Sequence, residues 1–481
     1  MSNLTDLLPA GAGGKQVSFV ASGTIGNGVT VGLNSDGTVS VIETGGPSAG
    51  SAENFNSSSS SRIATAFDAN ANKVVIAYRD EGNSDYGTAV VGTISGTSIS
   101  FGTPVVFRNA LSSHIAATFD SSANKIVIAY YDGGNSGYGT AIVGTVSGTS
   151  VSFGSAVVFE SAVSRNMSAT FDSNSNKVVI AYTDAGNSNH GTAIVGTVSG
   201  TSISFGSASV FFALSTTFIS ATFDSNSNKV VISWRDLNQG DGIALVATVS
   251  GTSISFGSAT FFESGTVAEF ISSTFDSNSN KIVISYALQN NSYYGTAIVG
   301  TVSGTSISFG SKVVFQSSYT DYGSATFDSN SNKIVISYKN LSNSGYGTAI
   351  VGTVSGTSIS FGTPIIFEPS SINWTASAFD SNSNTIVIAY QDAGNSNYGT
   401  SVVFQTESTN LTDFIGISDA AISDTASGSV TIKGGISTNV TGLTPNATYY
   451  VQTDGSLSTT ASSVLAGKAL SSTSINLDYT S

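Results

Sequence analysis

The chain is organised by one phrase, FDSNSNK, that recurs with small changes along most of its length. Its Phe-Asp pair occurs seven times, and each occurrence lies 52 residues after the previous one. Seven copies at a fixed period predict a repeat architecture in which each copy is one structural unit. The pairs are Phe67-Asp68, Phe119-Asp120, Phe171-Asp172, Phe223-Asp224, Phe275-Asp276, Phe327-Asp328 and Phe379-Asp380.

Each unit contains four stretches with the composition of β-strands, separated by Ser/Asn/Gly turns, and none has a helical period. Four strands in about 50 residues are typical of a propeller blade. The predicted fold is therefore all-β, with a seven-bladed β-propeller of four strands per blade; a β-solenoid is the competing interpretation. In the third copy the strands, named a to d, are Ser168–Asp172, Lys177–Tyr182, Gly191–Val198 and a run containing Ile203, Phe205, Val210 and Phe211.

The sequence also indicates how the ring would close. The seventh copy has strands a, b and c, ending at Gln405, but no strand d. Before the first copy, Ser51–Phe55 has the composition and spacing of an isolated strand d, since Phe55 lies 12 residues before Phe67. We therefore predict that this N-terminal strand completes the seventh blade beside its strand c, so that no sheet edge stays exposed.

Composition narrows the function. Only 10% of residues are charged, the net charge is −14, and 16 Lys and Arg are spread over 481 residues. Nucleic-acid binding needs clustered basic side chains, so nucleic acid is rejected as a partner. The chain has no cysteine, which excludes disulfides and thiolate sites. No signal peptide and no apolar run of about 18 residues is recognisable, so membrane insertion is not expected.

The ends of the chain predict a second unit. Met1–Gly14 is interpreted as an arm, Val17–Glu43 as a hairpin around an Asn-Ser-Asp-Gly turn, and the segment after Asp413 as short β runs. If strand d closes the ring as predicted, the two segments emerge side by side. We expect them to form one small β module with the propeller inserted between its halves. The predicted boundaries are 1–49 and 406–481 for this module and 50–405 for the propeller.

Three stretches carry a resemblance to a known group of proteins. The opening MSNLTDLLPAGAGGKQVSFVASGTIGNGVTVGLNSDGTVSVIE, the phrases of the type NKVVIAYRDEGNSDYGTAVVGTISGTSISFG, and the tail phrases FIGISDAAISD and TGLTPNATYYVQTDGSLSTTA resemble structural proteins of tailed marine phages, cyanophages in particular. The resemblance covers most of the chain. It implies a virion protein, either tail-fibre-like or a capsid decoration, that binds a host-surface glycan or receptor and meets other virion proteins through its terminal module. A low-charge Ser/Thr/Asn surface also permits packing into a homo-oligomer.

The repeats differ from one another mainly between strands d and a. These connections are expected to be loops that gather at one mouth of the central channel, where binding commonly resides. Aromatic planes beside polar groups suit sugars; the alternative is that the side chains pack locally within each loop. The candidate ligand-binding residues are Arg62, His114, Arg165, Phe218, Glu269, Phe270, Asp321, Tyr322, Asn373 and Trp374. Trp234, by contrast, replaces the Tyr that ends strand b and is expected to be packing.

The connection between strands b and c weakly resembles the Asp-box of sialidase-like propellers. Its acid, conserved among five copies as Asp80, Asp132, Asp184, Asp236 and Asp392, is expected to cap a turn. A calcium site at Asp80, Asn83 and Asp85 is the alternative, but most copies carry only one acid, so no metal is predicted. Surface ion pairs across the a–b turn, such as Asp172 with Lys177, are also expected.

Three functions stay open: a non-enzymatic virion adhesin, a purely architectural or decoration protein, and a glycan-cleaving hydrolase. Glycoside hydrolysis needs two carboxylates about 5–10 Å apart. Glu269 and Asp321 are the best acid pair available, and no nucleophile with its base stands out. The expectation is therefore a glycan-binding protein of the virion, with no catalytic residues and no cofactor.

Overall fold

The computed structural model of the chain describes residues 15–477, and of Ser408, Thr409 and Thr412 only the backbone. The described chain is all-β apart from short 3₁₀ turns. It divides into two compact units, one made of Pro47–Thr406 and the other of the flanking residues on both sides. The repeat unit thus begins three residues before the predicted position 50, because β5 (Ser48–Ala49) already pairs with its last strand. The predicted arm at Met1–Gly14 lies outside the described residues.

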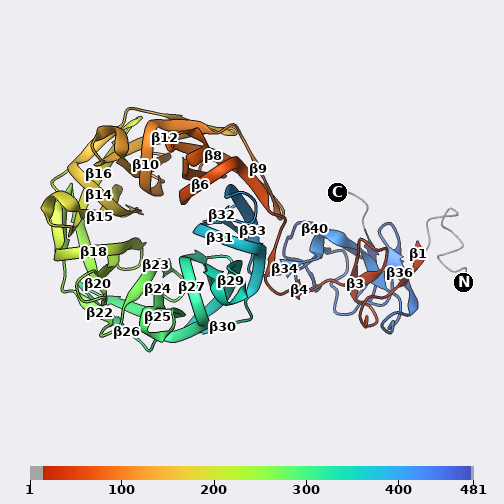
Figure 1. The fold of residues 1–481 in the computed structure, drawn as a ribbon. Helices are drawn as coiled ribbons and strands as arrows, with labels where there is room; N and C mark the ends of the chain where they lie inside the picture. The colour runs from red at the N-terminus through yellow and green to blue at the C-terminus, as the bar shows by residue number, and fades with distance from the viewer. Residues whose placement is uncertain (1–14, 478–481) are drawn as a thin grey trace, which may run out of the picture. The chain divides into compact units, whose positions relative to one another are not determined.

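The repeat unit consists of strand hairpins arranged around a ring (Figure 1). The second strand of each repeat is buried along nearly its whole length, and a 3₁₀ turn or short loop leads to the third strand. The second strands are β7 (Lys73–Asp80), β11 (Lys125–Asp132), β15 (Lys177–Asp184), β19 (Lys229–Asp236), β24 (Lys281–Leu288), β28 (Lys333–Asn340) and β32 (Thr385–Asp392). The third are β8 (Tyr86–Ser95), β12 (Tyr138–Ser147), β16 (His190–Ser199), β20 (Gly242–Ser250), β25 (Tyr294–Ser303), β29 (Tyr346–Ser355) and β33 (Tyr398–Gln405).

Strands a and d are not separate elements joined by loops, and this part of the prediction is wrong. In six places they form one continuous strand of 16 residues, and only β22 (Thr260–Glu263) and β23 (Ala268–Asp276) are split. The first half of β10 pairs with β8 and its second half with β11, so each long strand belongs to two neighbouring hairpins. The long strands are β6 (Glu53–Asp68), β10 (Val105–Asp120), β14 (Val157–Asp172), β18 (Ser209–Asp224), β27 (Val313–Asp328) and β31 (Ile365–Asp380).

A further short strand was missed, because the sequence analysis merged it with strand d. After each tight SGTS turn the chain forms a four-residue outer strand, whose fourth residue is the Phe of SISF or its variant. Outer strands are β9 (Ser98–Phe101), β13 (Ser150–Phe153), β17 (Ser202–Phe205), β21 (Ser253–Phe256), β26 (Ser306–Phe309) and β30 (Ser358–Phe361). In the last repeat, β5 takes the equivalent position.

The predicted pairing between the two ends of the repeat region is present. β33, the last strand, pairs antiparallel with the first half of β6, where Ser401 faces Glu53 and Tyr398 faces Ser59. β5 extends this edge by pairing Ala49 with Phe404. The network of backbone hydrogen bonds therefore returns to its starting strand.

The core of the repeat unit lies between neighbouring hairpins. Each second strand carries a buried aromatic side chain two residues before its end. In the first and fourth repeats it packs on a Phe of the preceding long strand, with Tyr78 on Phe55 and Trp234 on Phe211 both at 5.0 Å between centroids. Trp234 is fully buried, as predicted for a packing residue. Gly87 explains the recurring YGT phrase, since a Cβ there would approach the Phe107 ring to 2.4 Å.

The Asp of each Phe-Asp pair stabilises the turn after it. Asp172 is 2% exposed, and its Oδ1 accepts hydrogen bonds from the amides of Asn174 (2.9 Å) and Ser175 (3.0 Å). Among the ion pairs of residues 15–477, none joins such an Asp to the Lys that follows the turn. The expected Asp–Lys surface bridges are therefore replaced by Asx turns, because the backbone amides already satisfy the carboxylate.

The terminal unit joins both ends of the described chain. Its first sheet has the order β1 (Gln16–Val20), β36 (Ser427–Ile432), β35 (Phe414–Ser418), β2 (Thr30–Leu33) and β3 (Val39–Val41). The predicted pairing of N-terminal and C-terminal segments is thus present. The second sheet contains β37 (Ile436–Ser437), β41 (Ile475–Leu477), β40 (Val464–Ala469), β38 (Thr448–Val451) and β39 (Leu457–Ser458). Short strands β4 (Thr44–Gly45) and β34 (Ser408–Thr409) pair where the chain passes between units.

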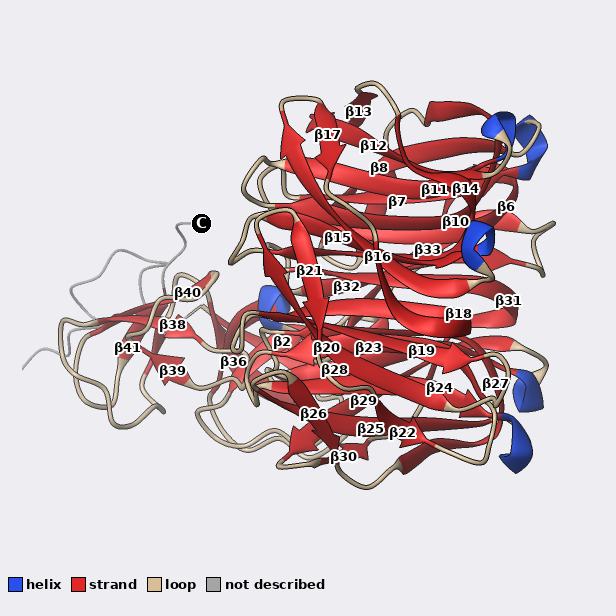
Figure 2. Cartoon of the chain, turned by 90° about the vertical axis from the view of Figure 1, so that its left-hand side faces the viewer, coloured by secondary structure: helices blue, strands red, loops and turns tan. Residues whose placement is uncertain are grey.

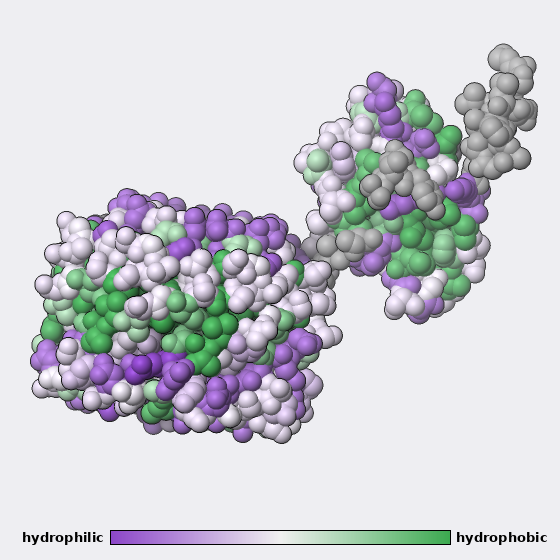
Figure 3. Space-filling view, turned by 90° about the horizontal axis from the view of Figure 1, so that it is seen from above, coloured by the Kyte–Doolittle hydropathy of each residue, from purple (hydrophilic) through white to green (hydrophobic). Residues whose placement is uncertain are grey.

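Two surface features complete the description of residues 15–477. No helix among them is long and apolar enough to cross a membrane. Apolar patches interrupt the polar outer wall of the repeat unit (Figure 3). Exposed apolar side chains recur at one position of the long strands and β22, namely Val106, Val158, Val210, Phe261, Val314 and Ile366.

Candidate functional site

Every repeat contains a β-bulge at the same place, between the two halves of the long strand. In β10 the register with β11 shifts between Ser113 and Ala116, and the six other repeats shift at the equivalent residues. One residue of each bulge has a left-handed backbone with φ between 48° and 54°. We call these seven residues the bulge ring; they are Arg62, His114, Asn166, Phe218, Phe270, Tyr322 and Trp374.

The bulge positions sit at the end of the ring that carries the connections between second and third strands. In β6, Ser60 pairs with Asp80, the residue from which the 3₁₀ turn η2 (Glu81–Asn83) begins. Figure 2 shows such turns gathered along one rim of the repeat unit. The bulges, which stand where loops between strands d and a were expected, therefore lie toward the same end of the ring as these turns.

Aromatic side chains of the bulge ring contact one another across repeats. The rings of Phe218 and Phe270 have centroids 5.0 Å apart, Phe270 and Tyr322 lie 5.5 Å apart, and Tyr322 and Trp374 lie 4.9 Å apart. The Arg62 Cζ continues the series at 4.1 Å from the Trp374 ring centroid. Four adjacent repeats therefore present a continuous aromatic arc, which the arginine ends.

The bulge ring borders a hollow. Six of its residues, together with the following residues such as Ile63 and Met167, line a space of about 480 Å³. Six predicted candidates, Arg62, His114, Phe218, Phe270, Tyr322 and Trp374, belong to the bulge ring. The four aromatic side chains do not pack only within their own repeats, because their contacts join different repeats.

The remaining four candidates lie one residue earlier in their repeats. Arg165, Glu269, Asp321 and Asn373 precede bulge-ring residues and pair in register with the second strands. Asn166, which the sequence analysis missed, occupies the third place in the ring instead of Arg165. The signal was available, since residue 166 is the one that follows His114 by 52 positions.

Two of these flanking residues hold neighbouring repeats together. The Glu269 carboxylate accepts from Arg235 Nη1 at 2.7 Å, with both side chains under 20% exposed. The Asn373 side chain accepts from Lys339 Nζ and donates to Gln391 Oε1, both at 2.8 Å. Glu269 is thus occupied by an ion pair.

Asp321 is in a different environment. Burial raises its pKa to about 6; the Tyr322 amide and Lys339 counteract the rise, and Glu269 adds to it. A small internal cavity lies beside Asp321 and Gly323, at the position where other repeats carry larger side chains such as Ile271. Asp321 is therefore the acid of this region that lacks full charge compensation.

His114 is held as a neutral ring. Its Nδ1 accepts a hydrogen bond from the Asn166 amide at 3.2 Å, so this nitrogen carries no proton. Burial, together with the charges of Arg62 and Arg165, lowers the pKa of His114 to about 4. The imidazole therefore bridges two repeats and adds no charge at neutral pH.

The rim connections behave as structural turns. Asp392 Oδ1 accepts from the amides of Gly394 (3.0 Å) and Asn395 (3.1 Å), and Asp132, Asp184 and Asp236 make similar bonds. Asp80 instead accepts from the Asn56 side chain at 3.1 Å. Asp85, considered as a calcium ligand, pairs with Arg79 at 2.6 Å. Within residues 15–477 no three acidic or His side chains gather as a metal site would need.

Below the bulge ring, serine hydroxyls link the innermost strands. Ser168 Oγ accepts from the Ala221 amide of the next repeat at 2.9 Å. The same bond recurs from Ser273 to Ser220, from Ala325 to Ser272 and from Ser377 to Ser324. At the far end of the channel, Thr and Phe side chains of the repeated phrase line a second hollow of about 500 Å³. The side chains that line that hollow are nearly the same in every repeat. The bulge-ring residue, by contrast, differs between repeats, except that two repeats carry Phe.

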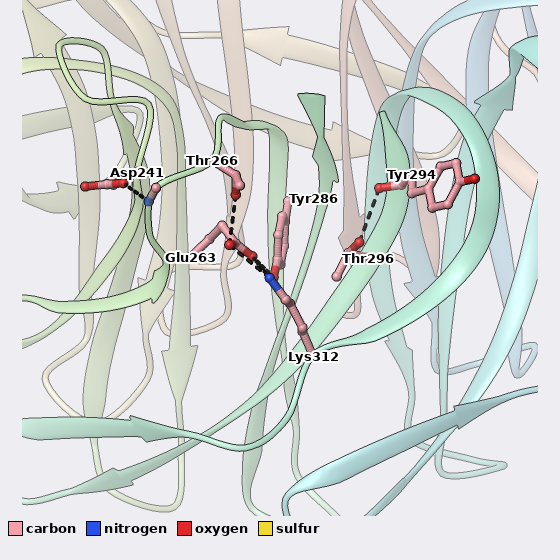
Figure 4. Close-up of polar contacts among 8 residues, drawn as sticks. Asp241, Glu263, Thr266, Tyr286, Tyr294, Thr296 and Lys312 are labelled. Atoms are coloured by element: carbon pink, nitrogen blue, oxygen red, sulfur yellow. Dashed lines mark hydrogen bonds and ion pairs between the residues drawn. The ribbon is translucent and has the colours of Figure 1, made fainter. Parts of the chain in front are cut away.

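A buried acid also lies between the fourth and fifth repeats, outside the bulge ring. Figure 4 shows Glu263 surrounded by Thr266, Tyr286 and Lys312. Its carboxylate accepts from Thr266 Oγ1 at 2.8 Å, Tyr286 Oη at 3.2 Å and Lys312 Nζ at 2.9 Å. The Glu263 carboxylate is satisfied within the cluster, so the cluster connects repeats and is not offered as a ligand site.

The fold and this site define a propeller-like protein of repeated strand hairpins, with a diverse ring of side chains at one channel mouth. The sequence matches no protein-family model and no curated protein. Among solved structures, the fold is similar to the BP39L lectin from Burkholderia pseudomallei, with a TM-score of 0.55 at 9% identity, over 73% of this chain and 97% of that chain. At such an identity the likeness concerns the fold alone.

Two other structural neighbours are more distant. The periplasmic gluconolactonase PpgL of Pseudomonas aeruginosa gives a TM-score of 0.47 at 9% identity, over 74% of this chain and 97% of that one. The SapL1 lectin, solved with alpha methyl fucoside, gives 0.40 at 13% identity, over 65% and 97%. Neither carries an argument about this chain.

Proposed function

We propose that the repeat unit is a closed seven-bladed β-propeller that binds a glycan at the bulge ring and does not cleave it. The observation that carries this proposal is the aromatic arc of Phe218, Phe270, Tyr322 and Trp374 beside a hollow of about 480 Å³. Sugar rings have an apolar face that stacks on aromatic planes, and polar side chains at the rim can bond their hydroxyls. Aromatic planes and polar side chains are both present at the bulge ring.

The geometry of the bulges supports binding over local packing. Holding a bulky non-glycine residue in the left-handed region costs about 1–2 kcal/mol, and five repeats do so, with Arg62, Phe218, Phe270, Tyr322 and Trp374. Backbone strain of this kind concentrates at functional sites, where it aims side chains in a required direction. The fold class, shared with a lectin at the level of architecture, is compatible with the same use.

The proposal includes a place on the surface of a phage particle, with the terminal unit as the attachment module. This part rests on the sequence resemblance described above. It is tested by mass spectrometry of purified particles and by the loss of incorporation when residues 407–481 are deleted.

The absence of catalysis is also proposed, and hydrolysis is the alternative. Asp321, whose pKa is raised to about 6, has a property expected of a general acid. Its nearest acidic partner, Glu269, is engaged by Arg235, which argues against a second free carboxylate. Release of reducing ends from a bound glycan, lost in Asp321→Asn, would establish the hydrolase instead.

Glycan-array binding by the purified chain tests the central proposal. We expect specific binding, with an affinity that falls at least about tenfold in Trp374→Ala and in Tyr322→Ala. Each substitution removes one aromatic contact with the sugar. Phe261→Ala is the matched control, because Phe261 is an aromatic side chain that is 56% exposed on β22, away from the bulge ring. Absence of binding, or binding that survives both ring substitutions, contradicts the proposal.

A further inference from the structure

Charged side chains are distributed unevenly around the bulge ring. Basic side chains gather in the first three repeats, where Arg62 and Arg165 flank His114. Acidic side chains gather in the fifth and sixth repeats, as Glu269 and Asp321. A chain with a net charge of −14 thus presents a local positive region at one side of this channel mouth.

The two acids differ in how far their charge is compensated. Glu269 forms an ion pair with Arg235 at 2.7 Å. Asp321 is stabilised by the Tyr322 amide at 3.0 Å and by the nearby charge of Lys339. The negative charge left uncompensated on this side of the ring is therefore that of Asp321 in the sixth repeat.

The two arginines are not compensated in the same way. Among the ion pairs within 4.0 Å formed by residues 15–477, none includes Arg62 or Arg165. Glu81 is the acid whose charge reaches Arg62, but its two oxygens accept hydroxyl hydrogen bonds of 2.6 Å from Ser59 and Ser61. The other nearby cation, Arg79, is paired with Asp85.

Arg62 is also fixed in position. Its guanidinium lies over the Trp374 ring at 4.1 Å and lines the hollow, and burial lowers its pKa without removing its charge. A guanidinium held on an aromatic plane keeps its N–H groups free for a planar anion. Arg165 is exposed, and its charge acts on His114 as that of Arg62 does.

We propose that the glycan bound at the bulge ring is acidic, and that Arg62 and Arg165 hold its carboxylate or sulfate group. The apolar face of the sugar then stacks on the arc from Phe270 to Trp374. This inference rests on the proposed function, since it names the chemical class of ligand for the same site. Carboxylated sugars and sulfated sugars share the anionic chemistry, and the test separates them.

The experiment measures the affinity of the full chain for three matched oligosaccharides: a neutral one, the same with a sialic or uronic acid, and the same with a sulfate ester. We expect at least one acidic form to bind about tenfold tighter than the neutral one, with the advantage shrinking as salt is raised. Arg165→Gln should reduce the affinity for the acidic form by a larger factor than the affinity for the neutral form. Arg62→Gln should lower both affinities, because Arg62 lines the hollow beside Trp374, and that for the acidic form by the larger factor.

Lys125→Gln is the control for net charge, because Lys125 begins β11 at the opposite end of the strand from the bulge. It should change neither affinity. If all three oligosaccharides bind equally well and Trp374→Ala still weakens their binding, the proposal of an acidic ligand is overturned. The proposal of a glycan site is then retained. Absence of binding to all three, with Trp374→Ala indistinguishable from wild type, overturns the proposed function itself.

Discussion

The guanidinium of Arg62 stacks on the indole of Trp374, with 4.1 Å between the arginine Cζ and the ring centroid. Arg62 belongs to β6, the first long strand, and Trp374 to β31, the last one. The contact therefore joins the first repeat to the last, beside the backbone pairing of β6 with β33.

A double-mutant cycle on this contact should show coupling. Arg62→Met and Trp374→Leu keep apolar volume but remove the cation and the π system. A partly desolvated cation–π pair contributes about 0.5–2 kcal/mol. The change in the free energy of unfolding of the double variant should therefore differ from the sum of the two single changes by that amount. Urea unfolding of the four proteins measures it. Additivity within about 0.3 kcal/mol would mean that the contact stabilises nothing.

His114 should make the repeat unit less stable in mild acid. Its folded pKa of about 4 lies below the ordinary value of 6.5. As pH falls from 6.5 to 4, His114 becomes protonated in the unfolded chain but stays neutral in the folded one. The free energy of unfolding therefore falls by about 3 kcal/mol. His114→Asn retains an acceptor for the Asn166 amide and should remove this dependence.

Urea unfolding between pH 4 and 8 checks this, with His190→Asn as the control for losing a histidine elsewhere. The control should keep the wild-type profile. A pH profile of His114→Asn that matches wild type contradicts a buried neutral imidazole.

Asp321→Asn should stabilise the protein above neutral pH. A folded pKa of about 6, raised from 3.8, means that ionisation costs stability as pH rises through that interval. The asparagine can accept the same amide hydrogen bond without charge. We expect a gain of about 1 kcal/mol at pH 8, after allowing for partial solvent screening, and none near pH 3.5. An equal gain at both pH values would point to packing and not to charge.

The serine bonds of the channel wall can be exchanged between repeats. Ser168→Ala removes the acceptor for the Ala221 amide and should lower the free energy of unfolding by about 1 kcal/mol. Ala116 occupies the same position one repeat earlier. Ala116→Ser should restore the equivalent bond to the Ala169 amide and raise stability by about 0.5–1 kcal/mol. Chemical denaturation measures both variants. The free energy of unfolding should fall in Ser168→Ala and rise in Ala116→Ser.

Lys312 should matter more than its exposure suggests. Lys312→Met leaves Glu263, which is 5% exposed, with hydroxyl partners only. Removing one partner of a buried pair leaves an uncompensated charge, so we expect a loss of about 1–3 kcal/mol at pH 7. Lys333→Met is the matched control, since its exposed ammonium bonds Thr353 and its loss should stay within about 0.5 kcal/mol. Thermal unfolding of both variants compares them.

The repeat period predicted much of this structure. The spacing of Phe55 and the missing last strand identified the partner of β33 before any coordinates. The continuous apolar, β-branched run after each turn, such as Lys177–Tyr182, identified the second strands. These features depend on local composition and a fixed period, which a sequence displays directly.

The bulges could not be predicted in the same way. The segment around Arg62 is rich in serine and lacks apolar alternation, so it has the composition of a loop although it continues a strand. A register shift depends on the neighbouring strand and leaves no local pattern. Six of the seven bulge-ring positions were among the candidate residues because variation among copies was visible; that they bind a ligand stays a prediction. The contacts that join them required coordinates.

The backbone pairing that closes the repeat region has a mechanical consequence. The chain enters at Pro47 and leaves at Thr406, and its paired strands β5 and β33 meet at that point, with Ala49 opposite Phe404. Tension drawn through both connections would load these hydrogen bonds one after another, as a zipper is loaded, and not all together. The seam between β33 and β6 is therefore the place where a pulled molecule should yield first, at low force, while the other repeats stay folded.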